Sequence, residues 1–221
     1  MKNRLVVIEG ACDGIGKTTQ FQLLRNRFQK EGEEVISHHF PSYGTYHGEA
    51  VSRYLKGEFG AIKELSTYFV HNLYAMDRAV TWYTKLKKEY EEGKLILLDR
   101  YTTSSLIYQS SLFENLLDVK DFVRYVEDLE YQKLGIQKPD CVIFLHAPFD
   151  LVTRMREERK DNEGVTNDIH ESDLDFMRRV YYTGMFLADY LNWNKVSCEE
   201  NNSLRSVQDI HEDIYRLVRK K

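Results

Sequence analysis

One stretch of the chain, from Ile8 to Gln20, constrains the fold more than any other. It reads IEGACDGIGKTTQ, follows a short apolar run and precedes a segment with helical spacing. Its residues 16–18, Gly-Lys-Thr, match the end of the phosphate-binding pattern G-x-x-x-x-G-K-[ST]. The first glycine of that pattern would be residue 11, which is Ala11, whereas the glycine stands one place earlier at Gly10. The strict spacing is therefore broken by one residue.

Despite the shifted glycine, the stretch is typical of a site that binds nucleotide phosphates. A glycine-rich turn between a strand and a helix aims backbone N–H groups at one point, and the helix N-terminus adds roughly half a positive charge. Lys17 can then reach the terminal phosphates of ATP, and the Thr18 hydroxyl can bind Mg²⁺. Gly-Lys-Thr alone also occurs by chance, but the flanking strand and helix favour the phosphate site. The candidate ATP-binding residues of this loop are Gly10, Asp13, Gly14, Ile15, Gly16, Lys17, Thr18 and Thr19.

A carboxylate inside this loop, Asp13, requires an explanation, because a negative charge beside phosphates is unfavourable unless it faces another group. It can cap the following helix. We favour the alternative that it accepts hydrogen bonds from a sugar hydroxyl of a second substrate.

Short apolar runs alternate with longer segments of helical spacing along the chain. Four runs are continuous and rich in Val, Ile and Leu, as in strands buried on both faces of a parallel sheet, and a fifth is weaker. The predicted strands are 5–10, 33–40, 94–100, 140–146 and 194–199, and the predicted helices are 20–32, 66–93, 120–135, 149–160, 172–193 and 203–220. This alternation predicts an α/β fold with an active site outside the carboxyl ends of the strands.

Composition limits the classes of protein that remain. A chain of 221 residues without a Gly/Ser-rich linker fits one domain, 1–221, and a formal net charge of −4 argues against a nucleic-acid partner. Cys12, Cys141 and Cys198 are widely spaced, which disfavours a disulfide framework or zinc site and suggests a reducing compartment. No apolar run is long enough for a signal peptide or membrane span, so we expect a cytoplasmic protein without a membrane partner.

Taken together, these segments resemble the thymidylate kinase family nearly from end to end. The resemblance is carried by VVIEG and DGIGKTTQ, then by FPSYGT, AMDR, DRYTTSSLIYQ, KPDCVIFL and HEDIYRL. It implies a fold like that of P-loop nucleoside monophosphate kinases: a five-stranded parallel sheet in the order 2-3-1-4-5, flanked by helices, with a mobile lid. It also implies ATP- and Mg²⁺-dependent phosphorylation of dTMP to dTDP in dTTP synthesis, and a homodimer.

The pair Asp99 and Arg100 follows a buried predicted strand. Asp99 is suited to hold Mg²⁺ through water, and the forked guanidinium of Arg100 can bind two phosphate oxygens. A mutual salt bridge is the alternative, but both charges should face the same cleft as Lys17. The resemblance implies that Arg100 binds the dTMP phosphate and bridges it towards the γ-phosphate of ATP.

The resemblance also implies a nucleoside pocket. Tyr74 and Arg78 are four residues apart on one helical face, a spacing that alone favours a core aromatic residue beside a surface arginine. With the resemblance, Tyr74 stacks on the base, where most members of the family carry phenylalanine, and Arg78 donates to a thymine carbonyl. The other implied dTMP-binding residues are Phe40 in the pocket, Ser105 and Gln109 at the thymine edge, Tyr108 against the deoxyribose, Asp13 at the sugar and Arg53 at the phosphate. Arg53 can equally be a solvated helix residue.

The segment RMREERKDNEGVTNDIHE is dense in charge, as exposed mobile loops usually are. A kinase must exclude water from the transferred phosphoryl group, so we expect a lid at about 156–168. Some family members carry a catalytic arginine in the phosphate loop, where this chain has Gly14. The charge is then expected from the lid, from Arg154, Arg156, Arg159 or Lys160, and an arginine near Arg154 is implied to stack on adenine.

The main hypothesis is therefore a dTMP kinase. Its candidate catalytic residues are Lys17, Arg100, Asp99, Asp13, Arg156 and Arg159, and its candidate metal ligands are Thr18 and Asp99. One alternative is a kinase for another nucleotide or for a deoxynucleoside. The other is a non-catalytic nucleotide-binding relative, which only Ala11 and the shifted Gly10 support.

Overall fold

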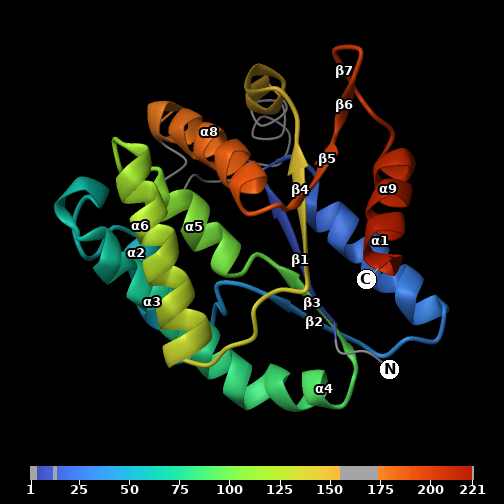
Figure 1. The fold of residues 1–221 in the computed structure, drawn as a ribbon, viewed down its shortest axis with the longest axis horizontal. Coiled ribbons are helices and arrows are strands. Elements are labelled where there is room, and N and C mark those ends of the chain that lie inside the picture. The colour runs from blue at the N-terminus through green and yellow to red at the C-terminus, as the bar shows by residue number, and fades with distance from the viewer. Residues whose placement is uncertain (1–3, 12–13, 155–173, 221) are drawn as a thin grey trace.

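The computed structural model describes residues 4–11, 14–154 and 174–220, with a five-stranded sheet at its centre (Figure 1). Neighbouring strands all run parallel, in the order β2-β3-β1-β4-β5. The strands are β1 (Arg4–Gly10), β2 (Val35–His39), β3 (Leu95–Asp99), β4 (Cys141–His146) and β5 (Asn194–Ser197). The predicted sheet, its order and its five strands are confirmed. Because Ile8 and His39 both pair with Asp99, the carboxyl ends of β1, β2 and β3 meet at one edge.

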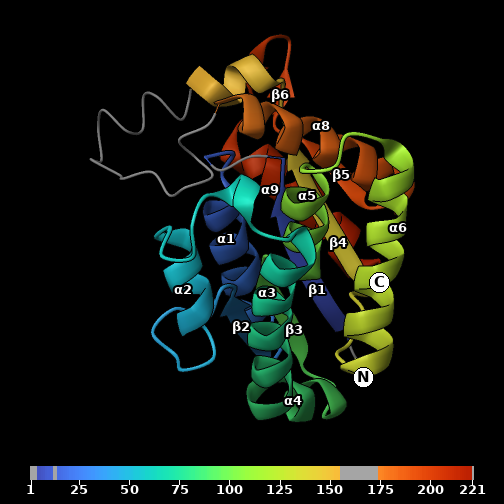
Figure 2. The same ribbon diagram turned by 90° about the vertical axis from the view of Figure 1, so that its left-hand side faces the viewer.

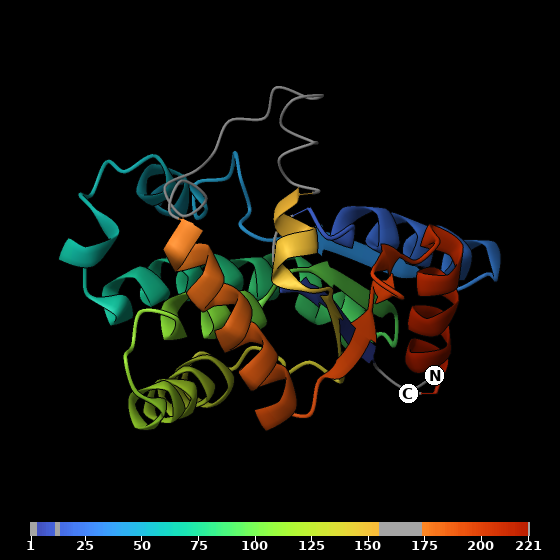
Figure 3. The same ribbon diagram turned by 90° about the horizontal axis from the view of Figure 1, so that it is seen from above.

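Apolar side chains cover both faces of the sheet, which explains why its three central strands, β1, β3 and β4, are mostly apolar and buried. Along β1, Leu5 and Val7 pack in one core cluster with Trp82, whereas Val6 and Ile8 belong to the other cluster. In Figures 1 and 3, α1 (Lys17–Lys30) and α9 (Val207–Arg219) lie together on one side, and α3 (Thr67–Thr81), α5 (Thr102–Ser110) and α6 (Leu116–Val126) lie on the other. Helix α8 (Leu174–Tyr190) packs against α5.

Several helical segments differ from the predicted ones in their ends or continuity. The predicted helix 66–93 consists of α3, a π-helical segment η2 (Trp82–Leu86) and α4 (Lys87–Glu91), which follow one line in Figure 2. Helix α6 likewise continues into a π-helical segment, η3 (Glu127–Lys133). The predicted helix 203–220 begins as β7 (Ser203–Leu204), which pairs antiparallel with β6 (Glu199–Glu200). Helix α2 (Glu49–Leu55) and the 3-10 turn η1 (Ile62–Glu64) lie between β2 and α3.

Helix α5 has no predicted counterpart, because the threonines and serines at its start have low helix propensity. Seven of its nine residues are buried. The hydroxyls of Thr103 and Ser104, in its first turn, donate to the carboxylate of Glu9 in β1. Contacts with the sheet therefore stabilise a helix that its local sequence does not favour.

Two predicted features extend beyond the described residues. The predicted lid at 156–168 lies wholly outside them, and the predicted helix 149–160 is helical over 149–154 and otherwise outside them. A search of the described part of the chain finds no helix that is both long and apolar enough to span a membrane.

Candidate active site

The turn between β1 and α1 has the backbone geometry of a phosphate-binding loop. Gly14 and Gly16 have φ angles of 89° and 91°, a region that residues with a Cβ rarely adopt. Helix α1 begins directly afterwards, at Lys17. The first backbone N–H groups of a helix have no intrahelical partner and, with the helix dipole, favour an anion. Thr18 and Thr19 are exposed in this turn, so their hydroxyls are accessible to a ligand.

Gly10 provides space for the side chain of Lys17. A Cβ on Gly10 would lie 2.9 Å from Ile15 Cγ2 and 3.1 Å from both Cγ and Cδ of Lys17. The aliphatic stem of Lys17 therefore passes directly over the backbone of Gly10, and Lys17 is only 6% exposed. The shifted glycine is required by this close packing.

The extra residue of the loop, Ala11, extends the sheet. Its N–H donates to the carbonyl oxygen of Leu145 at 2.9 Å, just beyond the pairing of Gly10 with Leu145. Its side chain is fully buried in the core. Asp13, the predicted acid of the loop, lies outside the described residues, and its role stays a prediction.

Asp99 ends β3 as a buried carboxylate with one oxygen available. His39 Nδ1 lies 3.1 Å from Asp99 Oδ2, whereas Asp99 Oδ1 has no hydrogen-bond partner among the described residues. Burial favours a higher pKa for Asp99, but the hydrogen bond with His39 and the charges of Lys17 and Arg100 outweigh burial and hold the pKa below its usual value. An ionised carboxylate with an unused oxygen fits Mg²⁺, which keeps several waters and takes further ligands from substrate phosphates.

Arg100 follows β3 in a left-handed backbone conformation, with a φ angle of 66°. Its Nη1 lies 3.8 Å from Oε1 of Glu9, a fully buried carboxylate in β1. Glu9 also accepts hydrogen bonds from Thr103 Oγ1, at 2.9 Å, and from Ser104 Oγ. The sequence predictions missed Glu9, although an acid inside an apolar buried strand is a usable signal, because such a charge requires partners.

A cavity of about 210 Å³ opens beside Arg100. It is lined by seven of the predicted dTMP-binding residues: Phe40, Tyr74, Arg78, Arg100, Ser105, Tyr108 and Gln109. It is also lined by six residues that were not predicted: His39, Pro41, Tyr43, Leu55, Tyr101 and Ser104. Most of these six belong to β2, to α5 or to the turns beside them, where side-chain direction depends on the packed fold.

Aromatic rings form much of the cavity wall. The ring centroids of Phe40 and Tyr101 are 5.7 Å apart, and Tyr74 is half-buried. The guanidinium carbon of Arg100 lies 5.6 Å from the ring centroid of Tyr108. Flat apolar faces of this kind can stack on a nucleotide base.

Buried polar groups complete the cavity. Gln109 is 2% exposed, and its Oε1 has no partner within the described part of the chain. Arg78, also 2% exposed, donates to both carboxylate oxygens of Glu130 at 2.7 Å and to Ser105 Oγ at 2.9 Å. Burial opposes the charge of Arg78, but Glu130 outweighs burial and leaves the pKa of Arg78 raised. The side chains of Gln109 and Arg78 can therefore form hydrogen bonds with the polar edge of a ligand.

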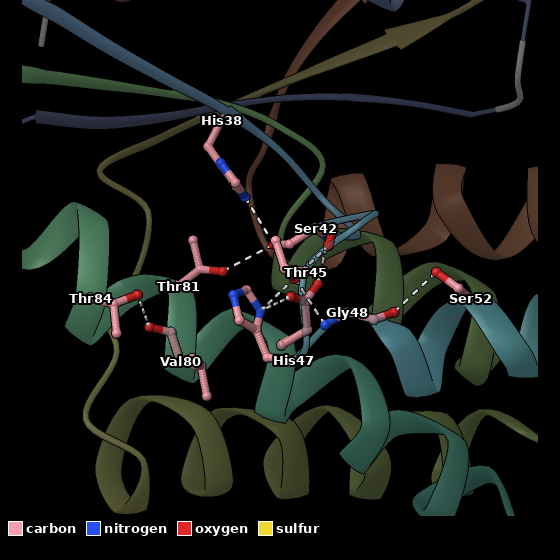
Figure 4. A network of polar contacts seen from close by, with 10 residues as sticks. His38, Ser42, Thr45, His47, Gly48, Ser52, Val80, Thr81 and Thr84 are labelled. Carbon is pink, nitrogen blue, oxygen red and sulfur yellow. Dashed lines mark hydrogen bonds and ion pairs between the residues drawn. The ribbon is translucent and has the colours of Figure 1, made fainter.

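A network of polar contacts holds the loop 41–48, which carries two of the cavity-lining residues (Figure 4). Ser42 is its centre: its N–H donates to Asp77 Oδ2 at 2.8 Å. Its hydroxyl lies 3.0 Å from Thr81 Oγ1 and 2.9 Å from His38 Nε2, and Figure 4 shows it between these two side chains. The loop is thereby tied to both α3 and β2.

Two further predicted site residues that the structure describes, Arg53 and Arg154, do not line the cavity. Arg53 is exposed on α2, with its Nε 2.9 Å from Glu49 Oε1. Arg154 is exposed in the helical segment 149–154. Arg156 and Arg159 lie outside the described residues. Their roles stay predictions.

Comparisons with known proteins show the family of this chain. A profile of the thymidylate kinase family matches residues 8–214. The chain is 31% identical over 181 residues to a thymidylate kinase of Mycobacterium tuberculosis, which covers 80% of this chain and 81% of that protein. It is 30% identical over 217 residues to a probable thymidylate kinase of Thermococcus gammatolerans (96% and 94% covered) and 27% identical over 222 residues to a thymidylate kinase of Exiguobacterium sibiricum (100% and 98%). The phosphate-binding loop and the cavity both lie within the matched residues, and the chain belongs to the thymidylate kinase family.

Proposed function

We propose that the loop at Lys17 and the cavity beside Arg100 form one active site, in which ATP and dTMP meet. As a member of its family, the protein is an ATP-dependent nucleoside monophosphate kinase that phosphorylates dTMP to dTDP. One observation carries the proposal, namely that Asp99 joins the two parts. Its partner His39 lines the cavity, while the charge of Lys17 acts on the same carboxylate.

Transfer of the phosphoryl group depends on position and on charge neutralisation. Lys17 binds the terminal phosphates of ATP, and Arg100 holds the dTMP phosphate in line with them. The attacking oxygen of dTMP is already anionic, so no general base is required. The carboxylate of Glu9, which accepts hydrogen bonds from two hydroxyls, pairs with Arg100 and helps to hold it in place. Thr18 and Asp99 would hold Mg²⁺, which supplies further neutralisation of phosphate charge when it is bound.

The cavity binds the nucleoside by stacking and by hydrogen bonds to the base edge. Tyr74 stacks on thymine, Arg78 donates to a carbonyl oxygen of the base, and Ser105 and Gln109 contact the same edge. The Oε1 of Gln109 is buried and has no partner among the residues that the structure describes, which supports this role, because burying an acceptor without a hydrogen-bond donor is unfavourable. Tyr108 lies against the sugar and disfavours a 2′-hydroxyl.

A homodimer is supported by an apolar stripe along α3 and η2. Residues 69, 73, 76, 80 and 83 follow the alternating spacing of four and three that lets helices pack against each other. Three of them, Phe69, Met76 and Tyr83, are 44%, 53% and 56% exposed. A second copy of the chain that packs on this stripe would remove these side chains from water.

The dimer proposal predicts that Met76→Glu shifts the protein towards the monomer, because a charge at the centre of the stripe must be desolvated on association. Sedimentation velocity over a range of protein concentrations measures the effect. Val207→Glu is the matched control, since Val207 is 52% exposed but lies on α9. An unaltered protein that stays monomeric at high concentration would contradict the dimer.

A cytoplasmic location is also proposed. Cys141 and Cys198 are both buried free thiols. Persistent free thiols are usual in a reducing compartment, which supports the cytoplasm.

The functional test is an assay that couples ADP formation to NADH oxidation, with dTMP, dCMP, UMP and thymidine as acceptors. We expect dTMP to give the highest kcat/KM and Lys17→Met to lose nearly all turnover without loss of fold by circular dichroism. A higher kcat/KM for dCMP, UMP or thymidine than for dTMP would show that dTMP is not the preferred substrate. Calorimetric binding of ATP and dTMP without turnover would instead indicate a non-catalytic relative.

A further inference from the structure

A buried ion pair lies directly behind the cavity. Arg78 Nε and Nη2 donate to Glu130 Oε2 and Oε1, each at 2.7 Å. Glu130 is fully buried and belongs to the π-helical segment η3, a rare geometry that is frequent at functional sites. Two parallel hydrogen bonds between a guanidinium and a carboxylate fix the plane of the guanidinium as well as its position.

The hydrogen bonds of Arg78 determine which of its nitrogens can reach a ligand. Nη2 uses its second hydrogen on Ser105 Oγ, at 2.9 Å. Nη1 makes only a 3.5 Å contact with the carbonyl oxygen of Tyr101 among the described residues, at the outer limit of a hydrogen bond. Because Arg78 lines the cavity, Nη1 is the nitrogen with hydrogen-bonding capacity left for a bound molecule.

No second cation competes for Glu130 within the described residues. His71 Nε2 lies 3.5 Å from Glu130 Oε1 but is not aligned for a hydrogen bond. Burial, aided by the charge of Arg78, lowers the pKa of His71 to about 3, so His71 is neutral near pH 7. The orientation of Arg78 therefore depends on Glu130 and on Ser105.

We infer that Glu130 is a positioning residue for nucleotide recognition: it holds the guanidinium of Arg78 in the one plane that points Nη1 at an acceptor oxygen of the pyrimidine. This inference rests on the proposed contact between Arg78 and the base. Without the Glu130 carboxylate, Arg78 would be a buried charge without its counterion and would turn towards water or another acceptor.

The test is Glu130→Gln, which keeps the side-chain length but replaces one carboxylate oxygen by a donor that opposes Arg78. We expect KM for dTMP to rise about tenfold, the effect of one ordinary hydrogen bond, while KM for ATP stays the same. Asp128→Asn is the matched control, because Asp128 is an exposed carboxylate of the same segment that pairs with Lys133 on the surface. This control should leave both KM values unchanged.

A double-mutant cycle separates positioning from a merely structural role. Arg78→Met should raise KM for dTMP, and Glu130→Gln should add almost nothing in the Arg78→Met background. Equal effects of Glu130→Gln in both backgrounds would overturn the inference, as would an unchanged KM for dTMP in the single variant. If Arg78→Met leaves KM for dTMP unchanged, the proposed contact of Arg78 with the base fails instead.

A second comparison covers the case in which Glu130→Gln does not fold. Replacing both partners by apolar groups avoids an unpaired buried charge, and proteins often tolerate such replacements. Arg78→Met/Glu130→Met should then have the same KM for dTMP as Arg78→Met alone. A much higher KM in the double variant would mean that Glu130 acts independently of Arg78, which would overturn the inference.

Discussion

Glu9, Lys17, Arg78 and Asp99 are each less than a tenth exposed, although each carries an ionisable group. Burial of charge is tolerated only where partners compensate for lost water. Glu9 accepts from two hydroxyls, Arg78 is paired with Glu130, and Asp99 is bonded to His39. These contacts fix Glu9, Arg78 and Asp99 before a substrate binds, which is the condition for electrostatic catalysis without reorganisation.

Gly10→Ala is predicted to impair turnover through Lys17. The new Cβ would lie 2.9 Å from Ile15, which must shift, and 3.1 Å from the Lys17 stem, which must give way by a smaller distance. Misplacement of a catalytic group by about 1 Å costs roughly 100-fold in rate, and we expect kcat to fall by at least about tenfold. Steady-state kinetics with varied ATP measures the effect.

The control for this variant is Gly184→Ala in α8. It introduces a contact of the same length, 3.1 Å to Phe144 Cζ, but in the core away from the loop. It should lower thermal stability and leave kcat unchanged. If Gly10→Ala retains the full kcat, Lys17 does not depend on the space above Gly10.

At the scale of elements, α3 links the two sides of the nucleoside cavity. Arg78 points from α3 to the cavity, whereas the preceding residue, Asp77, bonds the loop 41–48. Asp77 Oδ1 lies 2.7 Å from His47 Nδ1 and its Oδ2 accepts from the Ser42 N–H. Two adjacent residues of α3 therefore set the distance between the loop 41–48 and the guanidinium of Arg78.

Asp77→Ala is predicted to free the loop 41–48 and to raise KM for dTMP. Its two hydrogen bonds are the attachment of this loop to α3 through a buried carboxylate, so backbone N–H groups of the loop should exchange with deuterium faster. Thr84→Ala is the control, because the Thr84 hydroxyl donates to the carbonyl oxygen of Val80 in its own helical turn (Figure 4). Unchanged exchange in the loop of Asp77→Ala would refute the attachment.

The elements differ in how well the sequence predicts them, for physical reasons. Strands buried on both faces give continuous apolar runs, so β1, β3 and β4 were predictable from the sequence pattern. The weaker fifth run was also found, whereas the order of the strands was predicted only through the family resemblance. Helix α5 was not, because its stability comes from burial and from Glu9 rather than from propensity. Glu130 was missed for a related reason: an acid in a charged helical segment looks solvated until packing places it against Arg78.

The proposed phosphate-binding residues could be found as a group because they are close together in the sequence. Most of the proposed base-binding residues were named only through the family resemblance, since spacing alone favoured ordinary core and surface roles for Tyr74 and Arg78. Cavity residues such as His39, Leu55 and Tyr101 depend on how β2, α2 and α5 pack. Arg53 was also suggested only by the resemblance, no bounds were predicted for its helix, and its side chain pairs with Glu49 on the surface.

At the scale of the whole molecule, buried histidines predict sensitivity to acid. Burial is the main cause that lowers the pKa of His71 to about 3 and of His38 to about 4. Between pH 6.5 and 5 the unfolded chain binds protons at these histidines and the folded chain does not, so the free energy of unfolding falls as the pH is lowered. For His71 the slope is at most about 1.4 kcal/mol per pH unit.

Urea unfolding at several pH values between 7.5 and 5 checks this prediction. The free energy of unfolding of His71→Gln should fall less steeply below pH 6.5 than that of the unaltered protein, because one titrating group has been removed. Comparison of slopes excludes any constant loss of stability caused by the substitution. Identical slopes for the two proteins would show that His71 takes up a proton in the folded state.

The hydrogen bond from Ala11 to Leu145 has a consequence for recognising related enzymes from their genes. The additional residue, Ala11, continues the pairing of β1 with β4. The number of residues before the loop can therefore vary while Gly14 to Thr18 keep their geometry. Sequence-pattern searches that require a fixed spacing between the glycines would miss this chain. Alignments that permit a gap at the strand end would retain it.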